Sequence, residues 1–236
     1  MKPVLLIAVN FVREQRWPIF TLLLWVLLLA FLGLLTGPHG HRDDLLFVFK
    51  QNAVYVVAFS IFFGGSAIYN ERRSRRILGV LSKAVSRQQY LSGLVLGVAI
   101  ACALYCFSLG LTASWTLGEA GFPMARVWFL MVSLVAACTL AGTVALMFST
   151  FLNPFFAAGA TAMVLGLPAL ASQFVGPRWG LVIPVWEIVA TIVNASFGAP
   201  GTAAWPTVAL AVAETVVLWL LAARIFAYVD IAVAVE

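Results

Sequence analysis

The stretch from Val127 to Pro177 contains no charged residue. As a single α-helix it would be about 75 Å long, more than twice the thickness of the hydrocarbon core of a bilayer. The stretch must therefore fold back once. The sequence FLNPFF marks the place, because Asn153 can cap a helix and Pro154 suits its first turn. We expect two membrane spans, at residues 128–150 and 154–175, and a kink in the second at Pro168.

The composition extends this interpretation to the whole chain. Of the 236 residues, 63% are hydrophobic and 10% are charged, whereas about 25% of a soluble domain is charged. So few charges cannot cover a water-facing surface, and the surroundings of the chain must be mostly lipid. We therefore expect one all-α polytopic domain with six spans, the other four at residues 17–37, 52–70, 91–116 and 205–227. Residues 1–16 have the pattern of an amphipathic helix in the membrane interface.

Residues 181–200 are apolar but include Pro184, Glu187 and Asn194. They are either a seventh span or a re-entrant segment before the last span. We favour the re-entrant segment, whose irregular backbone must be covered by protein or water. For Glu187, a hydrogen-bonded carboxyl is favoured over a functional site.

The distribution of Lys and Arg predicts the orientation. With six spans and a cytoplasmic N-terminus, ten of the fourteen basic residues lie inside, and four lie outside: Arg42, Lys50, Arg126 and Arg178. The positive-inside rule favours this arrangement, which places both termini in the cytoplasm.

The segment ERRSRRILGVLSKAVSRQQYLSG, residues 71–93, holds six of the fourteen basic residues between two apolar runs. Within it, Ile77, Val80, Leu81 and Ala84 have the spacing of one helix face. The sequence SRQQ then predicts a capping box, in which Ser86 and Gln89 start the next span. A loop helix with an apolar face needs a partner, which is either a lipid headgroup layer or a soluble protein.

This segment resembles the cytoplasmic coupling segment of type-2 ABC exporter permeases. The positions that match are Glu71, Leu78, Gly79, Leu81, Val85, Ser86, Arg87 and Gly93. The sequence VREQRW before the first span and RIFAYVDI at the end resemble the family more loosely, the latter through Phe226, Asp230 and Ile231. The family carries Lys or Arg after that Phe, where this chain has Ala227 and Tyr228.

The resemblance implies a permease subunit in the cytoplasmic membrane that pairs with a second copy or a paralogue, with two soluble ATPase subunits and with lipid, but not with nucleic acid. ATP and Mg would bind to the ATPase partner, and this chain would hold no cofactor. Independently, no lysine of the chain follows a glycine, so the chain has no P-loop of its own. The ATPase-coupling residues would lie in the segment 71–90: Glu71, Arg72, Arg75, Arg76, Ile77, Leu78, Gly79, Val80, Leu81, Val85, Ser86 and Arg87.

A substrate path is predicted from Glu214 in the last span and from the aromatic residues of the second span, Tyr55, Phe59, Phe62 and Phe63. A carboxylate inside a membrane costs about 2.5–3.5 kcal/mol, so Glu214 should face protein or water. It is either part of the path or a protonated carboxyl bonded to a neighbouring helix. The glycines of the second and third spans, including Gly64, Gly93 and Gly97, suit close helix packing.

Two further interpretations stay open. The sequence PHGHRDD offers a weak metal site from His39, His41, Asp43 and Asp44, but nothing fixes its geometry, so no metal is expected. The basic loop also suits a non-transporting scaffold that binds anionic lipid. An intramembrane enzyme is disfavoured, because the chain lacks H-E-x-x-H and G-x-S-x-G motifs. The apolar spans suit several classes of substrate, namely lipids, hydrophobic drugs and peptides, and the sequence does not select one of them.

Overall fold

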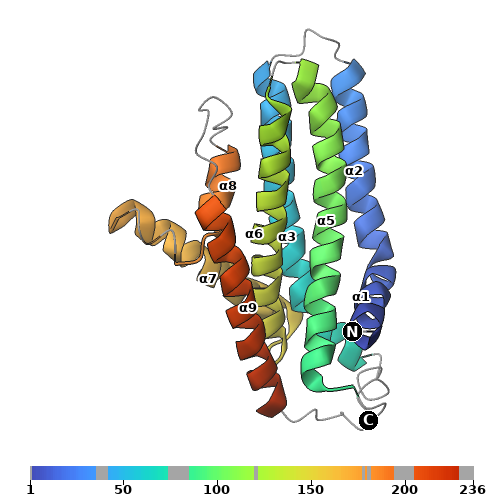
Figure 1. The fold of residues 1–236 in the computed structure, drawn as a ribbon, viewed down its shortest axis with the longest axis vertical. Coiled ribbons are helices and arrows are strands. Elements are labelled where there is room, and N and C mark those ends of the chain that lie inside the picture. Colours follow the sequence, from blue (N-terminus) through green and yellow to red (C-terminus); the bar gives the residue numbers. More distant parts are fainter. Residues whose placement is uncertain are drawn as a thin grey trace.

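The computed structural model describes residues 2–35, 42–73, 85–119, 122–176, 179, 182–193 and 205–228. Within these ranges the chain is helical and contains no strand (Figure 1). The helices are α1 (Lys2–Glu14), α2 (Arg16–Leu35), α3 (Arg42–Arg73), α5 (Arg87–Glu119), α6 (Met124–Ser149), α7 (Pro154–Phe174), α8 (Val185–Val193) and α9 (Trp205–Tyr228).

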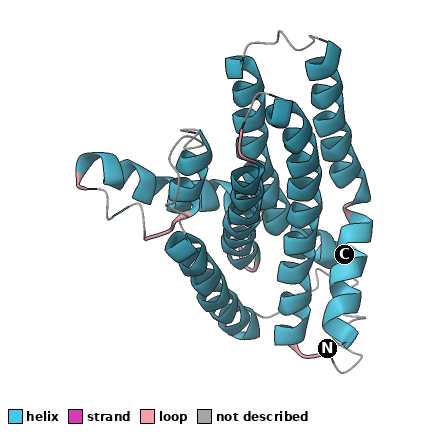
Figure 2. Cartoon of the chain, turned by 45° about the horizontal axis from the view of Figure 1, so that its top comes forward, coloured by secondary structure: helices cyan, strands magenta, loops and turns pink. Residues whose placement is uncertain are grey.

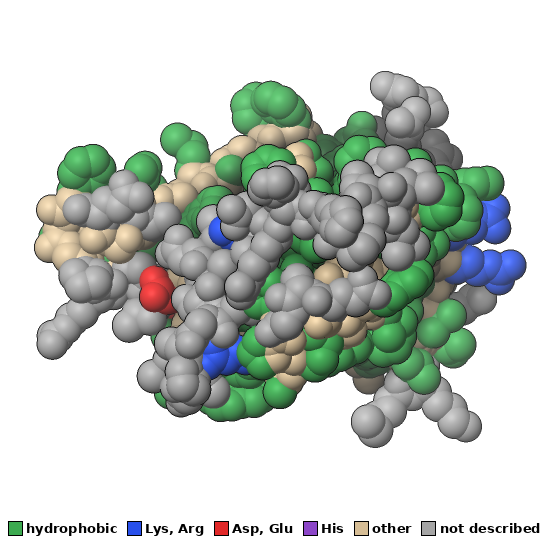
Figure 3. All heavy atoms as spheres, turned by 90° about the horizontal axis from the view of Figure 1, so that it is seen from above, with side chains coloured by type: hydrophobic (Ala, Val, Ile, Leu, Met, Phe, Trp, Pro, Cys, Tyr) green, Lys and Arg blue, Asp and Glu red, His purple; other side chains and the backbone are tan. Residues whose placement is uncertain are grey.

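Five of these helices, α3, α5, α6, α7 and α9, are long and apolar enough to cross a membrane. Helices α1 and α2 meet the same test together, with a bend of 64° between them, and raise the number to six. Apolar side chains cover much of the described surface seen in Figure 3. The chain is therefore a helical, multi-pass membrane protein, and six is the upper number of spans that the described helices allow.

Helix α6 lies at the centre of the bundle, between α3, α5 and α9 (Figure 1). Of its membrane-spanning stretch, 72% is buried, against 22% for α9. The helix carries small buried residues, among them Ala137, Ala141, Gly142 and Ala145, and small side chains allow helix backbones to approach closely. The sequence of α6 thus suits it to be packed on several sides at once.

Helices α3 and α6 cross in close contact at Gly64. A Cβ atom added to Gly64 would lie 2.1 Å from the carbonyl oxygen of Gly142. One turn earlier, the hydroxyl of Ser60 donates a hydrogen bond to the carbonyl oxygen of Cys138. Gly64 therefore packs backbone against backbone, as the small-residue pattern predicted.

The two helix starts predicted from capping patterns are confirmed. The backbone N–H of Ser86 donates to the side-chain oxygen of Gln89, and the N–H of Gln89 donates to Ser86 Oγ, both at 3.2 Å. This is the reciprocal capping box expected before α5. At the start of α7, Asn153 Oδ1 accepts from the N–H of Phe156 at 3.1 Å, and Pro154 occupies the first turn.

Helix α3 is longer than predicted at both ends. It begins at Arg42, not at residue 52, so Asp43 and Asp44 lie in its first turn and not in a loop; His39 and His41 lie outside the described residues. It continues to Arg73, so the segment expected to begin at Glu71 is still helical there. The physical reason is that residues 42–52 contain neither Gly nor Pro, so nothing in the sequence stops the helix.

Helix α7 was expected to be a second span that folds back after α6, but Figures 1 and 2 show it projecting sideways from the bundle. Only 18% of its membrane-spanning stretch is buried, and Phe155 and Phe174, near its two ends, are 83% and 85% exposed. The break between the two helices at Asn153 is thus confirmed, while the direction that α7 takes after it does not follow from its uniformly apolar sequence. Pro168 lies inside the helix.

The described part of segment 181–200 holds helix α8, whose nine residues correspond to about 14 Å, less than the thickness of the hydrocarbon core. Its residues Val185, Ile188 and Val189 are buried, and it packs against α6. Residues 194–200 lie outside the described ranges, so the re-entrant path of segment 181–200 stays a prediction.

Helix α1 packs along the first half of α5. Cβ atoms added to Gly93 and Gly97 would come within 2.6 Å of Ile7 and 2.7 Å of Phe11, so these glycines make room for α1. On its other side Leu5 and Leu6 are more than half exposed. The predicted N-terminal helix is present, and its place in the membrane interface stays a prediction.

Candidate functional site

The predicted coupling residues fall into three groups. Glu71 and Arg72 belong to the last turn of α3. The next group lies outside the described residues and comprises Arg75, Arg76, Ile77, Leu78, Gly79, Val80 and Leu81. Val85, Ser86 and Arg87 are described, and they lead into α5. Val85 packs against the core, and Ser86 caps α5.

Arg87 reaches from the start of α5 to the end of α9. Its Nη1 donates a hydrogen bond of 2.7 Å to the carbonyl oxygen of Phe226. Its guanidinium also lies over the ring of Phe226, 5.7 Å from the centroid, and that ring stacks on Tyr90 at 6.3 Å. Arg87 of the V-S-R turn and Phe226 of the C-terminal motif, separate in the sequence, thus meet in space. Sequence reasoning missed this contact, because no local pattern pairs residues 139 positions apart.

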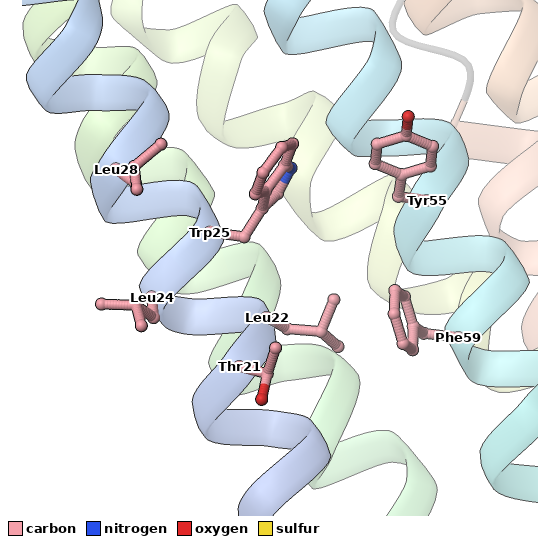
Figure 4. A pocket seen from close by; sticks show the side chains of 7 residues that line it. All are labelled: Thr21, Leu22, Leu24, Trp25, Leu28, Tyr55 and Phe59. Carbon is pink, nitrogen blue, oxygen red and sulfur yellow. The ribbon is translucent and has the colours of Figure 1, made fainter.

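Tyr55 and Phe59, two of the predicted path residues, line a groove of about 360 Å³ between α2 and α3 (Figure 4). The opposite wall comes from α2 and consists of Thr21, Leu22, Leu24, Trp25 and Leu28. We call this the α2–α3 groove. Its size lies within the range of small-molecule sites, about 300–1,000 Å³. Sequence reasoning did not find the α2 wall, since nothing in two apolar spans says which faces meet.

The hydroxyl groups beside the α2–α3 groove already have partners. Thr21 Oγ1 donates to the carbonyl oxygen of Trp17 at 2.9 Å, and the hydroxyl of Tyr55 accepts from Gln51 Nε2 at 2.6 Å. Most of the lining is aliphatic side chains and aromatic rings. The groove therefore suits an apolar group, since a polar one would give up its water without an equivalent partner.

The remaining path residues do not join this groove. Phe63 is 2% exposed and lies in the core, whereas Phe62 is 53% exposed and lies outside the lining of the groove. Glu214 lies on α9, which packs against α5, α6 and α8. Tyr55 and Phe59 thus line the groove, and the ring of Phe63 lies 6.3 Å from those of Phe59 and Phe62. Glu214 lies apart from them on α9, and the path as a whole stays a prediction.

Glu214 was interpreted either as part of a substrate path or as a carboxyl bonded to a neighbouring helix. It does not line the α2–α3 groove. Its Oε2 is shielded from solvent and has no hydrogen-bond partner within the described ranges. The neighbouring-helix bond that would make it purely structural is therefore not seen for this oxygen. Glu187, by contrast, is an exposed residue on the first turn of α8.

A buried polar pair links α3 to α5. The hydroxyl of Tyr105 donates to Asn52 Oδ1 at 2.9 Å, and Asn52 Nδ2 donates to the carbonyl oxygen of Val48 at 2.8 Å. Both residues are at most 2% exposed.

The free cysteines Cys102, Cys106 and Cys138 are buried on α5 and α6. Among the described residues no group of three or more His, Cys, Asp or Glu could hold a metal ion.

The Tyr105–Asn52 bond should measurably stabilise the bundle. Tyr105→Phe is expected to lower the free energy of unfolding by about 1 kcal/mol, because interhelical hydrogen bonds in membranes have this order of strength. Asn52→Leu should cost a similar amount, and the double variant less than the sum. Thermal unfolding in mild detergent measures this, with Tyr69→Phe, at an exposed tyrosine of α3, as the control. Strictly additive losses would contradict the pairing.

A comparison with protein-family models finds no match for this chain, and a comparison with curated protein sequences finds none either.

Proposed function

We propose that the chain is the permease subunit of an ABC exporter and that a separate soluble ATPase drives it. The observation that carries the proposal is the coupling pattern of residues 71–93, which lies between two long apolar helices and ends in the capping box of α5. The end of α3, the start of α5, the start of α1 and the end of α9 lie at one end of the bundle (Figure 1). We assign this end to the cytoplasmic side, where the ATPase would bind.

The α2–α3 groove is the best-supported part of the substrate path. It opens between two spans, and its lining is nearly all apolar. A substrate that used it would present a hydrocarbon or ring surface there. Phe62, Phe63 and Glu214 are not part of this proposal, because they do not line the groove.

A second permease copy is proposed to pack on α7. The exposed side of α7 carries Met163, Leu167, Leu170 and Phe174, all at least 55% exposed. They recur at intervals of four, three and four residues, which places them on one helix face. Lipid can cover such a face, but spacing of this kind is also that of helices that pack on one another.

This interface can be tested by adding bulk to it. Met163→Trp/Leu167→Trp is expected to shift the monomer–dimer equilibrium at least tenfold toward the monomer, since overpacking a close interface costs about 1–3 kcal/mol. Dimerisation in detergent would be followed by light scattering. Val216→Trp/Leu220→Trp places the same bulk at the same spacing on the exposed side of α9 and should leave the equilibrium unchanged. An equal effect of both pairs would contradict the α7 interface.

The proposed function as a whole is tested by affinity purification of the tagged chain in mild detergent, with mass spectrometry of the proteins that accompany it. A soluble ATPase in near-stoichiometric amount is the expected result. A monodisperse protein without ATPase would contradict the exporter and favour the lipid-binding scaffold. Binding of vesicles with and without anionic lipid would then test that scaffold.

A further inference from the structure

The last turn of α9 lacks a positive charge of its own. The final four carbonyl groups of any helix have no partner inside the helix, and a cation near them is favourable. In α9 the last turn contains no basic residue. Phe226, in this turn, is fully buried, with 0% exposure. A cation from elsewhere in the fold would therefore be favourable at the end of α9.

Helix α5 has the opposite irregularity. It begins with Arg87 and has no acidic residue in its first turn. A cation is unfavourable at the N-terminus of a helix, where the backbone N–H groups already give a partial positive charge. The local preferences of α5 thus do not explain an arginine at this position. A residue that breaks a local rule is expected to serve a contact made elsewhere.

The contact that Arg87 makes resolves both irregularities. Its Nη1 donates a hydrogen bond of 2.7 Å to the carbonyl oxygen of Phe226, which is one of the last four carbonyl groups of α9. Its guanidinium lies over the Phe226 ring, which stacks on Tyr90, itself 1% exposed. Lysine could supply the charge but not the planar group that both stacks and donates. The arrangement therefore depends on arginine.

We propose that Arg87 is a positioning residue that ties the end of α9 to the start of α5, so that a displacement of the start of α5 reaches the last span. The tie is short, because Arg87 directly follows Ser86 and Tyr90 lies one turn into α5. Only 22% of the spanning stretch of α9 is buried, so the contact at its end has a large influence on where α9 lies. The source of the displacement, an ATPase, rests on the proposed function, whereas the tie does not.

Hydrogen–deuterium exchange of the full chain in detergent tests the tie without any partner. Arg87→Gln is expected to speed exchange in the last turn of α9 about tenfold, since it removes a charged hydrogen bond that holds this turn. The exchange rate of Arg87→Lys in this turn should lie between those of the wild type and Arg87→Gln. Arg224→Gln, at an exposed arginine of α9, is the matched control and should change little. Equal exchange in wild type and Arg87→Gln would overturn the tie.

Transmission is tested by disturbing α5 and reading α9. Ser86→Ala removes half of the capping box and should speed exchange in the last turn of α9, but only while Arg87 is present. In the Arg87→Gln background the same change should add nothing at α9. Ser92→Ala is the control, because its hydroxyl bonds within α5, to the carbonyl oxygen of Gln88 at 2.7 Å. An effect of Ser86→Ala on α9 that is equal in both backgrounds, or absent with Arg87 present, would overturn transmission.

If the ATPase co-purifies, a non-hydrolysable ATP analogue supplies the displacement. The analogue should then change exchange at α9 in the wild type but not in Arg87→Gln, while residues 74–84 respond in both. A full response of α9 in Arg87→Gln would overturn the link, even with the ATPase bound. Absence of the ATPase would reject the proposed function, and the two preceding measurements would still decide the tie.

Discussion

Gly64→Ala is expected to destabilise the bundle by about 3 kcal/mol, because the added methyl group has no space. The Cβ atom would lie 2.1 Å from the carbonyl oxygen and 2.9 Å from the carbonyl carbon of Gly142. These are backbone atoms, so no side chain can rotate away, and α3 and α6 must separate. Alanine favours a helix over glycine by about 1 kcal/mol, which does not offset a clash of this size.

The measurement is the fraction of monodisperse protein that remains after heating in detergent. We expect the temperature of half-loss to fall by about 10 °C for Gly64→Ala. Gly65→Ala is the matched control, since a Cβ atom at the adjacent residue would make only an ordinary contact, 3.6 Å from the carbonyl oxygen of Pro154. It should be neutral or slightly stabilising. Equal half-loss temperatures for the two variants would show that α3 and α6 do not cross at Gly64.

Leu81→Asp is expected to reduce the co-purified ATPase to less than a tenth of its wild-type amount. Two sets of apolar residues in the coupling segment have helical spacing, and Leu81 belongs to both. The first set also contains Ile77, Val80 and Ala84, and the second also contains Leu78 and Val85. Burying an unpaired carboxylate in a protein contact costs several kcal/mol, and about 1.4 kcal/mol already corresponds to a tenfold loss of affinity. The chain should stay in the membrane, since its apolar helices are unchanged.

Two variants serve as controls for Leu81→Asp. Ser82→Asp adds the same charge one residue away but off the apolar pattern, and Leu81→Met keeps the apolar side chain; both should retain the ATPase. Quantitative mass spectrometry of the purified complexes gives the ratio of ATPase to permease. Full retention of the ATPase by Leu81→Asp would contradict the coupling assignment, and loss by all three variants would point to damage of the segment.

The amino-acid sequence correctly predicts helix starts that are marked by hydrogen bonds between nearby residues. Asn153 and Pro154 start α7 at the predicted residue, and Ser86 and Gln89 start α5. These predictions succeed because a cap is a bond between neighbours in the sequence, whose chemistry does not depend on the rest of the fold. The start of α3, by contrast, was misplaced because no capping pattern marks it. Polar residues before an apolar run indicated a loop, while the absence of Gly and Pro allowed a helix.

Some contacts between helices were decided by the tertiary structure alone. Examples are the seating of Gly64 on Gly142, the reach of Arg87 to Phe226 and the sideways course of α7. The α2–α3 groove and the separation of Glu214 from it belong to the same class.

The sequence by itself determined that this chain is helical, that it lies in a membrane and where several of its helices begin. It could not determine which helix faces meet. In water, an apolar stripe marks the buried side of a helix, but in lipid both the neighbouring helix and the acyl chains are apolar, so the hydrophobic pattern no longer distinguishes inside from outside. Only the packing of small residues and the few long-range hydrogen bonds in the folded structure settle that choice.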